Sequence, residues 1–337
     1  MLQITLEKPG HFGATESPEP TLGPGDALVK VHRIGVCGTD LHAFAGKQPF
    51  FAYPRVLGHE LGVEIIDPGD SPHGLKAGDR CSIEPYLNCG RCIACRRGKP
   101  NCCAELKVLG VHIDGGMRSL LAVPARKLHP SMQLDYDQLA LIETLGIGAH
   151  AVERAEVKRE DFVLVIGAGP IGLSVIQFVL VTGATLAVMD VAETRLAFCR
   201  NQLGVKSTVT PGEDSAAQLK KIGSGDLPTI VIDATGNARS MAGTFELAAQ
   251  GGRIVFVGLF QGDVTFNDPN FHRRELTLCA SRNALPKTFR DIITLVENGE
   301  VNTKPWITHR FGLSETPEIF PKTIAGNPAV LKAMVEV

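Results

Sequence analysis

Residues 161–190 decide the fold, and they read DFVLVIGAGPIGLSVIQFVLVTGATLAVMD. The run 161–167 is short and apolar, which is typical of a strand buried on both faces of a sheet. A segment of helical length follows and ends at Gly183, and residues 185–190 form a second apolar run. This order of strand, helix and strand predicts a parallel sheet with a crossover helix.

The same alternation continues toward the C-terminus. Further strands are expected near 207–209 and within 228–236, 252–258 and 275–281. Helical stretches lie between most of these strands, so the pattern indicates a doubly wound α/β fold of the Rossmann type. We therefore expect residues 146–284 to form one α/β domain of this kind.

The N-terminal part of the chain has a different pattern. Its apolar runs are short and interrupted by Gly and Pro, and the runs 27–36, 62–67 and 80–85 are typical of strands. Residues 1–145 are therefore expected to form a β-rich domain. We expect the segment 285–337 to return to this first domain and complete it.

The glycines of the decisive stretch form a GxGxxG motif, Gly167-Ala168-Gly169-Pro170-Ile171-Gly172, between a strand and a helix. In this setting Gly167 permits the tight turn, Gly169 lets a pyrophosphate approach the backbone, and Gly172 lets the helix pack against the strand. The free N–H groups of the helix N-terminus then face the phosphates. The motif predicts a dinucleotide site; a purely structural strand–turn–helix is the alternative.

Asp190 ends the second strand, 23 residues after Gly167. A carboxylate at this place accepts hydrogen bonds from the ribose hydroxyls and repels a 2′-phosphate, so NAD is favoured over NADP. Val257 and Gly258 end a later strand and are candidates for lining the nicotinamide pocket, with plain core packing as the alternative. The expected cofactor-binding residues are Gly167, Gly169, Pro170, Ile171, Gly172, Asp190, Arg195, Val257 and Gly258.

The composition limits the classes of function. The chain has 337 residues with 34 Lys and Arg against 36 Asp and Glu, so its formal net charge is -2. This balance gives no reason to expect a nucleic-acid partner, which needs a basic excess or patch. No apolar run reaches the ~20 residues of a membrane span, and the first residues lack the pattern of a secretory signal. We therefore expect a cytoplasmic protein without a membrane partner.

The nine cysteines are unevenly distributed, because seven of them lie between residues 37 and 103. Four of the seven have the spacing Cys89-x2-Cys92-x2-Cys95-x7-Cys103, which lets one loop wrap a tetrahedral Zn²⁺ and fill all its positions. A closed site has no place for a substrate, so this zinc would be structural. Disulfides are the alternative, which the reducing cytosol disfavours.

A second set of candidate metal ligands is more dispersed. Cys37 begins one short polar stretch, and His59 and Glu60 are adjacent further along the chain. A thiolate, an imidazole and a carboxylate together suit zinc, and three protein ligands leave a fourth position open, which is typical of a catalytic site. Spacing alone leaves ordinary structural roles for these residues open.

Taken together, these motifs resemble a known family. Cys37-Gly38-Thr39-Asp40, Gly58-His59-Glu60, the four-cysteine stretch and the GxGxxG motif occur in the order seen in zinc-containing medium-chain alcohol dehydrogenases. The resemblance covers essentially the whole chain. It implies a GroES-like catalytic domain that holds the zinc, a Rossmann domain that holds NAD, and a homodimer or homotetramer.

Within this family the chain looks most like the sorbitol, threonine and sugar-acid branch. The resemblance places Glu143 in or near the zinc ligands, so Glu60 and Glu143 are both candidates for binding the metal. It also implies a proton relay through Thr39 and His42, which act beside the metal ligands Cys37 and His59 in catalysis. The branch usually has Pro after this Glu, whereas this chain has Thr144.

The substrate expected from the resemblance is a small-molecule alcohol. Residues 53–60, 98–101, 109–116 and 281–284 resemble bacterial L-galactonate and L-gulonate 5-dehydrogenases. We expect a secondary alcohol of such a sugar acid, or of a polyol, to be oxidised to a ketone with NAD. The alternatives are an L-threonine 3-dehydrogenase and a catalytically silent sensor that binds NAD and zinc. The presence of both Thr39 and His42 argues against the silent protein.

Overall fold

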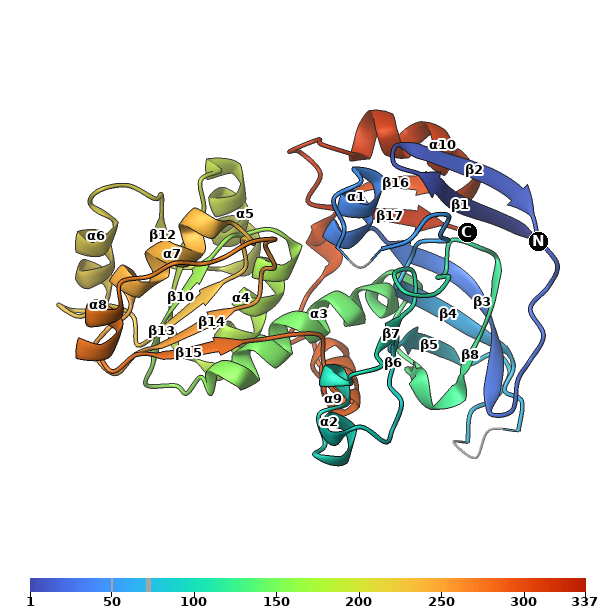
Figure 1. Cartoon of the computed structure of the whole chain (residues 1–337), viewed down its shortest axis with the longest axis horizontal. Helices are drawn as coiled ribbons and strands as arrows, with labels where there is room; N and C mark the ends of the chain where they lie inside the picture. Colours follow the sequence, from blue (N-terminus) through green and yellow to red (C-terminus); the bar gives the residue numbers. More distant parts are fainter. Residues whose placement is uncertain (50, 71–73) are drawn as a thin grey trace. The chain divides into compact units, whose positions relative to one another are not determined.

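The computed structural model describes residues 1–49, 51–70 and 74–337 of the chain. The chain folds into two structural units, and it first passes from one to the other within a long helix. The first unit contains residues 1–143 and 285–337, and the second contains residues 144–284. Figure 1 colours the chain from blue to red, and the red C-terminal strands lie beside the blue N-terminal ones within the first unit. The first unit is therefore discontinuous in sequence.

The first unit is built on a mostly antiparallel sheet with the strand order β16-β17-β3-β4-β5-β9, in which β8 also pairs with β3. Two smaller sheets, β1-β2 and β6-β7, belong to the same unit. Its strands are β1 (Leu2–Lys8), β2 (His11–Glu16), β3 (Asp26–Gly35), β4 (Glu60–Asp67), β5 (Arg80–Ile83), β6 (Tyr86–Leu87), β7 (Lys107–Val108), β8 (Leu120–Pro124), β9 (Leu128–Pro130), β16 (Ile307–Gly312) and β17 (Lys332–Glu336). Its helices and helical turns are α1 (Gly38–Phe44), α2 (Ile93–Arg96), η1 (Pro100–Cys102), η2 (Ala125–Lys127), α9 (Pro286–Glu297), η3 (Lys304–Trp306), η4 (Leu313–Glu315), α10 (Thr316–Ile319) and η5 (Phe320–Ile324), together with the first part of α3 (Tyr136–Ala155).

Strand β3 shows how the sequence pattern builds the core of this unit. Ala27, Val29 and Val31 are fully buried along it, while Lys30 between the last two is exposed. Alternation of this kind arises because successive side chains of a strand point to opposite faces of the sheet. Strand β3 pairs with β4, β8 and β17, so the buried face lies at the centre of the unit.

The second unit is a parallel sheet with the strand order β12-β11-β10-β13-β14-β15. Its strands are β10 (Phe162–Ile166), β11 (Thr185–Met189), β12 (Ser207–Val209), β13 (Ile230–Asp233), β14 (Arg253–Phe256) and β15 (Thr277–Ala280). Its helices are α4 (Pro170–Thr182), α5 (Glu193–Leu203), α6 (Ser215–Ile222), α7 (Ala238–Leu247) and α8 (Asp268–Arg273). The chain runs outward from β10 to β12 and then returns to β13 on the other side, so the predicted doubly wound sheet is confirmed.

The long helix α3 is the main departure from the predicted elements. It begins at Tyr136, inside the part of the chain expected to be β-rich. Its interior contains Gly146 and Gly148, and glycine lowers helix propensity. Gly148 has a packing role, because a Cβ there would lie 2.1 Å from the hydroxyl oxygen of Ser174 on α4. Close helix packing therefore outweighs local propensity at this place.

The described residues contain no helix that is both long enough and apolar enough to cross a membrane.

Candidate functional site

The four predicted thiol ligands come together in one lobe of the first unit, between β6 and β7. The sulfur atoms of Cys89, Cys92, Cys95 and Cys103 lie within 4.8 Å of one another. The Sγ atoms of Cys92 and Cys95 are 3.5 Å apart, far longer than the ~2.05 Å of a disulfide bond. All four are free thiols in the structure, and the neighbouring Cys102 is exposed outside the cluster. The donor set fits a closed tetrahedral zinc site.

Backbone groups prepare this lobe for a cation. The N–H of Cys89 donates to the sulfur of Cys103 at 3.2 Å. Hydrogen bonds from the N–H groups of Cys95 and Ala104 lower the pKa of Cys92 to about 6. A thiolate is the form that binds a metal, so these backbone donors favour the ligating state of Cys92, whereas burial raises the pKa of Cys103 to about 11.

The second predicted cluster is formed by neighbouring strands. Cys37 follows β3 and is the N-cap of α1, and His59 directly precedes Glu60, the first residue of β4. The antiparallel register pairs Gly35 with Glu60, which brings the two segments side by side. Potential ligand atoms of Cys37, His59 and Glu60 lie within 4.8 Å of one another. Gly35 is required here, because a Cβ would lie 2.0 Å from Glu60 Oε2.

The side chains of Asp40 and His59 face each other beside Cys37. The side chain of Asp40 is fully buried, accepts the N–H of Cys37 at 2.9 Å and points its other oxygen toward His59 Nδ1 at 3.9 Å. At that separation the pair is electrostatic rather than hydrogen-bonded. Burial raises the pKa of Asp40. Burial alone would lower the pKa of His59, but the charges of Cys37 and Asp40 outweigh burial, so the pKa of His59 is raised. His59 Nδ1 and Asp40 Oδ1 have no hydrogen-bond partner among the described residues, so a bound cation fits this site.

Two carboxylates lie in this buried region, and each has its own partner. The ammonium group of Lys332, from β17, contacts both oxygens of Glu60 and lies 2.6 Å from Oε1. The hydroxyl of Tyr86 donates to Glu143 Oε1. All four side chains are at most 4% exposed. The grouping of potential ligands contains Glu60, while the charge of Glu143 acts on His59 and Glu60 from beside it.

The two relay candidates lie on the short helix α1. Thr39 is half-buried and His42 is exposed. Residues three apart on a helix share one face, so both side chains lie on the same side of α1. The order from Cys37 through Thr39 to His42 therefore leads from the buried cluster toward solvent.

The predicted dinucleotide motif has the local geometry that its sequence requires. Gly167 has φ +94°, and a Cβ on it would contact Thr235 at 3.0 Å. A Cβ on Gly172 would lie 1.7 Å from the carbonyl oxygen of Gly167, so the helix approaches the turn closely. Gly169 is the N-cap of α4, and Pro170 and Ile171 form its first turn. A Cβ on Gly169 would meet only Arg195 Nη1, at 3.4 Å, so its backbone is open to a ligand.

Asp190 stands at the carboxyl end of β11, beside this loop. Its Oδ2 accepts the N–H of Ala168 at 2.6 Å, and its Oδ1 accepts the N–H of Ala192 at 2.8 Å. These bonds fix the carboxylate, and each oxygen has a further lone pair for a ligand hydroxyl. The structure thus brings the glycine loop, Asp190 and Arg195 together at the carboxyl edge of the parallel sheet, where ligands bind in doubly wound folds.

Val257 and Gly258 follow β14 at the same edge. The N–H groups of both residues bond to the carbonyl of Asp233, at 2.9 and 3.1 Å. A Cβ on Gly258 would lie 2.1 Å from the backbone nitrogen of Gly236. Close backbone packing therefore accounts for this glycine.

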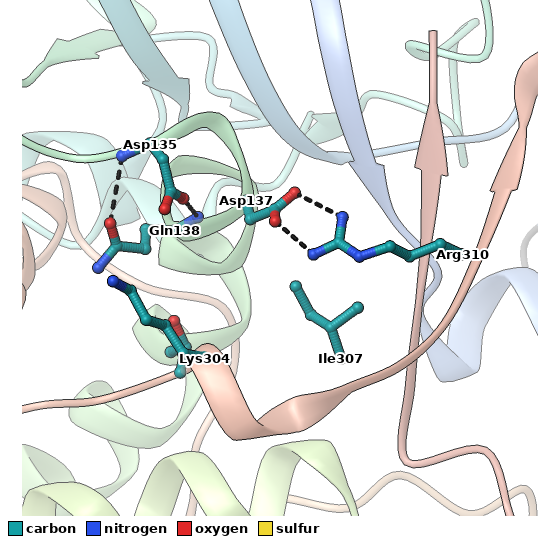
Figure 2. A pocket seen from close by; sticks show the side chains of 7 residues that line it. Asp135, Asp137, Gln138, Lys304, Ile307 and Arg310 are labelled. Atoms are coloured by element: carbon teal, nitrogen blue, oxygen red, sulfur yellow. Dashed lines mark hydrogen bonds and ion pairs between the residues drawn. The ribbon is translucent and has the colours of Figure 1, made fainter.

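A pocket of about 250 Å³ lies elsewhere in the first unit and is shown in Figure 2. Its lining residues are Asp135, Asp137, Gln138, Thr303, Lys304, Ile307 and Arg310. The guanidinium of Arg310 binds both oxygens of Asp137, at 3.1 and 2.5 Å, and Arg33 donates to the same carboxylate at 3.0 Å. Asp137 and Arg310 of its lining thus already pair with each other, and we treat this part of the pocket as a structural ion network.

Sequence reasoning missed Tyr86 and Lys332 as parts of the buried region. Lys332 is 272 residues from Glu60 in the chain, so no local spacing could indicate the pair. Tyr86 stands only three residues before Cys89, but a single tyrosine carries no ligand pattern. Both residues are recognisable only after β6, β17 and α3 have been placed.

The chain is similar to known proteins in both of its structural units. Residues 23–133 match the alcohol dehydrogenase GroES-like domain family, and residues 170–298 match the zinc-binding dehydrogenase family. The L-galactonate-5-dehydrogenase of Escherichia coli is 40% identical over 332 residues, which cover 98% of this chain and 98% of that protein. This similarity runs through both structural units.

Solved structures agree in fold over the whole chain. An alcohol dehydrogenase of Escherichia coli complexed with NADH has a TM-score of 0.91 at 28% identity, covering 100% of this chain and 99% of that chain. A zinc-binding dehydrogenase of Sinorhizobium meliloti bound to NADP has a TM-score of 0.92 at 28% identity, with the same coverage. The predicted combination of a GroES-like domain and a Rossmann domain is confirmed.

Proposed function

The chain belongs to the zinc-type medium-chain alcohol dehydrogenases, and from this premise we propose that it oxidises a secondary alcohol of a sugar acid or polyol to a ketone with NAD. The observation that carries the proposal is the buried cluster of Cys37, His59 and Glu60. Its three donors suit zinc and leave a coordination position for the alcohol oxygen. The 40% identity to L-galactonate-5-dehydrogenase supports a sugar acid as the substrate.

The metal would have two different roles in this chain. At the four-cysteine lobe all coordination positions are filled by protein, so the ion there would hold the lobe together. At Cys37, His59 and a carboxylate, bound zinc supplies Lewis-acid polarisation that lowers the pKa of an alcohol hydroxyl. Asp40 faces His59 Nδ1 and would hold the direction of the neutral, ligating imidazole.

The proton released from the alcohol needs a path to solvent. We assign Thr39 as the first acceptor, because it is half-buried on the helix that begins at Cys37. We assign His42 as the group that passes the proton on, since it is exposed one turn later. An imidazole exchanges protons readily near neutral pH, which suits this role.

The cofactor would bind at the carboxyl edge of the parallel sheet. The open backbone at Gly169 and the N-terminus of α4 would receive the pyrophosphate. Asp190 would accept the ribose hydroxyls and exclude a 2′-phosphate, which favours NAD over NADP. Arg195, beside Gly169, would contact the phosphate side of the nucleotide.

The experiment that tests this function is a substrate panel with the zinc-loaded protein and NAD. The panel contains L-galactonate, L-gulonate, sorbitol, galactitol and L-threonine, and formation of NADH is followed by absorbance. We expect turnover with a sugar acid or a polyol. Turnover with L-threonine alone would replace the proposed substrate class, and no turnover with any member, in protein that binds both zinc and NAD, would favour a silent sensor.

A further inference from the structure

The hydrogen bond between Tyr86 and Glu143 joins two parts of the first unit that are distant in sequence. Tyr86 lies on β6 and Glu143 lies in α3, and the two side chains are 3% and 4% exposed. The Tyr86 hydroxyl donates to Glu143 Oε1. Burial and the Glu143 charge raise the pKa of Tyr86 well above its ordinary value, so the phenol remains a donor. Glu143 is thereby fixed in direction beside the cluster of Cys37 and His59.

The two buried carboxylates, Glu60 and Glu143, differ in the partner that each side chain contacts. Lys332 brings a full positive charge to both oxygens of Glu60 and neutralises it. Tyr86 brings a neutral hydroxyl to Glu143, and burial raises the pKa of Glu143 although the charges of His59 and Lys332 act to lower it. A buried carboxylate without a cationic partner is costly unless a metal or another positive group faces it. The position of Glu143 therefore depends on a hydrogen bond from a neutral hydroxyl, whereas that of Glu60 depends on an ion pair.

Tyr86 also belongs to the base of the four-cysteine lobe. Strands β6 and β7 pair Tyr86 with Val108 and Leu87 with Lys107. The segment between these strands, residues 88–106, contains all four cysteines of the lobe. The Tyr86 ring also packs edge to face on Phe289, with ring centroids 6.2 Å apart at 74°. Closing the lobe around its own metal therefore fixes the strand that carries Tyr86.

We propose that Tyr86 is a positioning residue through which the four-cysteine lobe holds the Glu143 carboxylate beside the buried Cys37–His59–Glu60 cluster. The lobe then does more than stabilise the fold, because it also sets the position of the Glu143 carboxylate at the other metal site. This inference rests on the proposed zinc-dependent function. It assigns the lobe an indirect influence on the buried metal.

The test replaces Tyr86 by Phe in the full chain, which removes the hydroxyl and keeps the ring on Phe289. The protein carries zinc in the lobe and Co²⁺ in the buried cluster, whose visible absorption reports the ligand arrangement. We expect Tyr86→Phe to shift these absorption bands and to weaken Co²⁺ binding at this site by about 10- to 100-fold, with the lobe zinc retained. The kcat of the zinc enzyme should fall more than its KM rises.

Tyr136→Phe is the matched control. Tyr136 donates to Glu64 Oε2 at 3.3 Å, so it is a second tyrosine–glutamate pair of the same unit. This variant should leave the cobalt spectrum and the metal affinity unchanged. An unchanged spectrum and affinity in Tyr86→Phe, or an equal change in Tyr136→Phe, would overturn the inference. If Tyr86→Phe does not fold, Glu143→Gln must produce the spectral shift instead, and its failure to do so counts against the inference equally.

The link to the lobe has a test of its own. Cys92→Ser opens the lobe, and we expect it to shift the cobalt bands of the distant buried site in the same direction as Tyr86→Phe. Cys102→Ser, at the exposed neighbouring cysteine, should not. A normal spectrum in Cys92→Ser would remove the lobe from the proposal. The spectra need no turnover, so they decide this inference even if the substrate panel fails.

Discussion

The two candidate metal clusters of the first unit are built in opposite ways. The lobe draws four thiols from 15 consecutive residues, and its cysteines lie near the surface, with only Cys103 buried. The cluster at Cys37 draws on two strands and one helix, and Glu60 is neutralised by a lysine 272 residues away. A local set of ligands can gather around a metal by itself, whereas the assembled set exists only when β3, β4 and β17 have paired. The difference separates a site that stabilises the fold from a site that the fold creates for chemistry.

The largest effect is expected from a substitution that disrupts the buried cluster and leaves the lobe intact. Cys37→Ser removes the thiolate of the open site, so turnover should be lost, and the metal content should fall from about two to about one ion per chain. Steady-state kinetics, metal analysis and circular dichroism measure these quantities. Cys279→Ser, a cysteine outside both clusters, is the control and should keep both ions. Two retained ions in Cys37→Ser would show that the residue is not a metal ligand.

The reverse substitution breaks the lobe. Cys103 is buried and accepts the N–H of Cys89, so Cys103→Ser should release the lobe metal and lower the thermal midpoint by a clear margin, because structural zinc contributes folding free energy directly. Cys102→Ser changes the adjacent, exposed cysteine and should leave the midpoint and the metal content as they are. Equal midpoints for the two variants would mean that the lobe does not stabilise the fold.

The third test removes the positive charge of Lys332, which is distant from Glu60 in sequence. Lys332→Met leaves the carboxylate of Glu60 buried without its cation, which should destabilise the protein by about 3–5 kcal/mol. Lys322→Met is the matched control, since Lys322 pairs with Glu318 at 2.9 Å on the surface and should contribute no more than about 0.5 kcal/mol. Urea unfolding of the proteins with zinc in the lobe and no metal in the buried cluster measures both. A small effect of Lys332→Met would show that the buried cluster does not depend on its distant partner.

The same contrast explains how much the sequence could predict. The lobe and the glycine motif were predictable because each has its residues in one short segment, and each segment has one geometry that its chemistry demands. Cys37, His59 and Glu60 could be proposed as a set, but their proximity depends on the pairing of Gly35 with Glu60. The roles of Tyr86 and Lys332 could not be predicted, because a hydrogen-bond partner from another element leaves no trace in local spacing.

Helix α3 illustrates the same limit for the fold. Its glycines lower the local helix propensity. Gly148 is nevertheless needed, because Ser174 from another helix approaches it closely. The parallel sheet raised no such difficulty, since its strands are short continuous apolar runs. Elements that are set by local pattern were therefore predicted, and an element that is set by packing was not.

A substitution at the dinucleotide site should have a smaller effect, limited to cofactor binding. Asp190→Ala removes the carboxylate expected to bind the ribose, and the loss of hydrogen bonds to a charged group should weaken NAD binding by roughly 10- to 100-fold. The preference for NAD over NADP should shrink as well. Calorimetric titration with both dinucleotides measures this, and Asp214→Ala, an exposed aspartate of the same unit, is the control. An unchanged preference would remove Asp190 from the ribose site.

The smallest expected effect concerns a charged network outside both clusters. Asp137 is partly buried, which opposes its ionisation, but hydrogen bonds and charge from Arg310 and Arg33 outweigh burial and lower its pKa. A carboxylate with a lowered folded-state pKa stabilises the protein above its ordinary pKa of about 4, and this contribution is lost as the pH falls through the lowered pKa. Asp137→Asn should therefore cost about 1 kcal/mol at neutral pH and progressively less below about pH 4.

Urea midpoints of wild type and Asp137→Asn across this pH range test the network against the two clusters. The metal ligands titrate in both proteins, so the difference between the two curves isolates Asp137. Asp291→Asn removes an exposed carboxylate paired with Lys287 and should give a nearly flat difference. A flat difference for Asp137→Asn as well would show that the arginines stabilise this carboxylate no more than water does. In that case the ionic stabilisation of this unit would come from its buried pairs, Glu60 with Lys332 and Glu84 with Lys127.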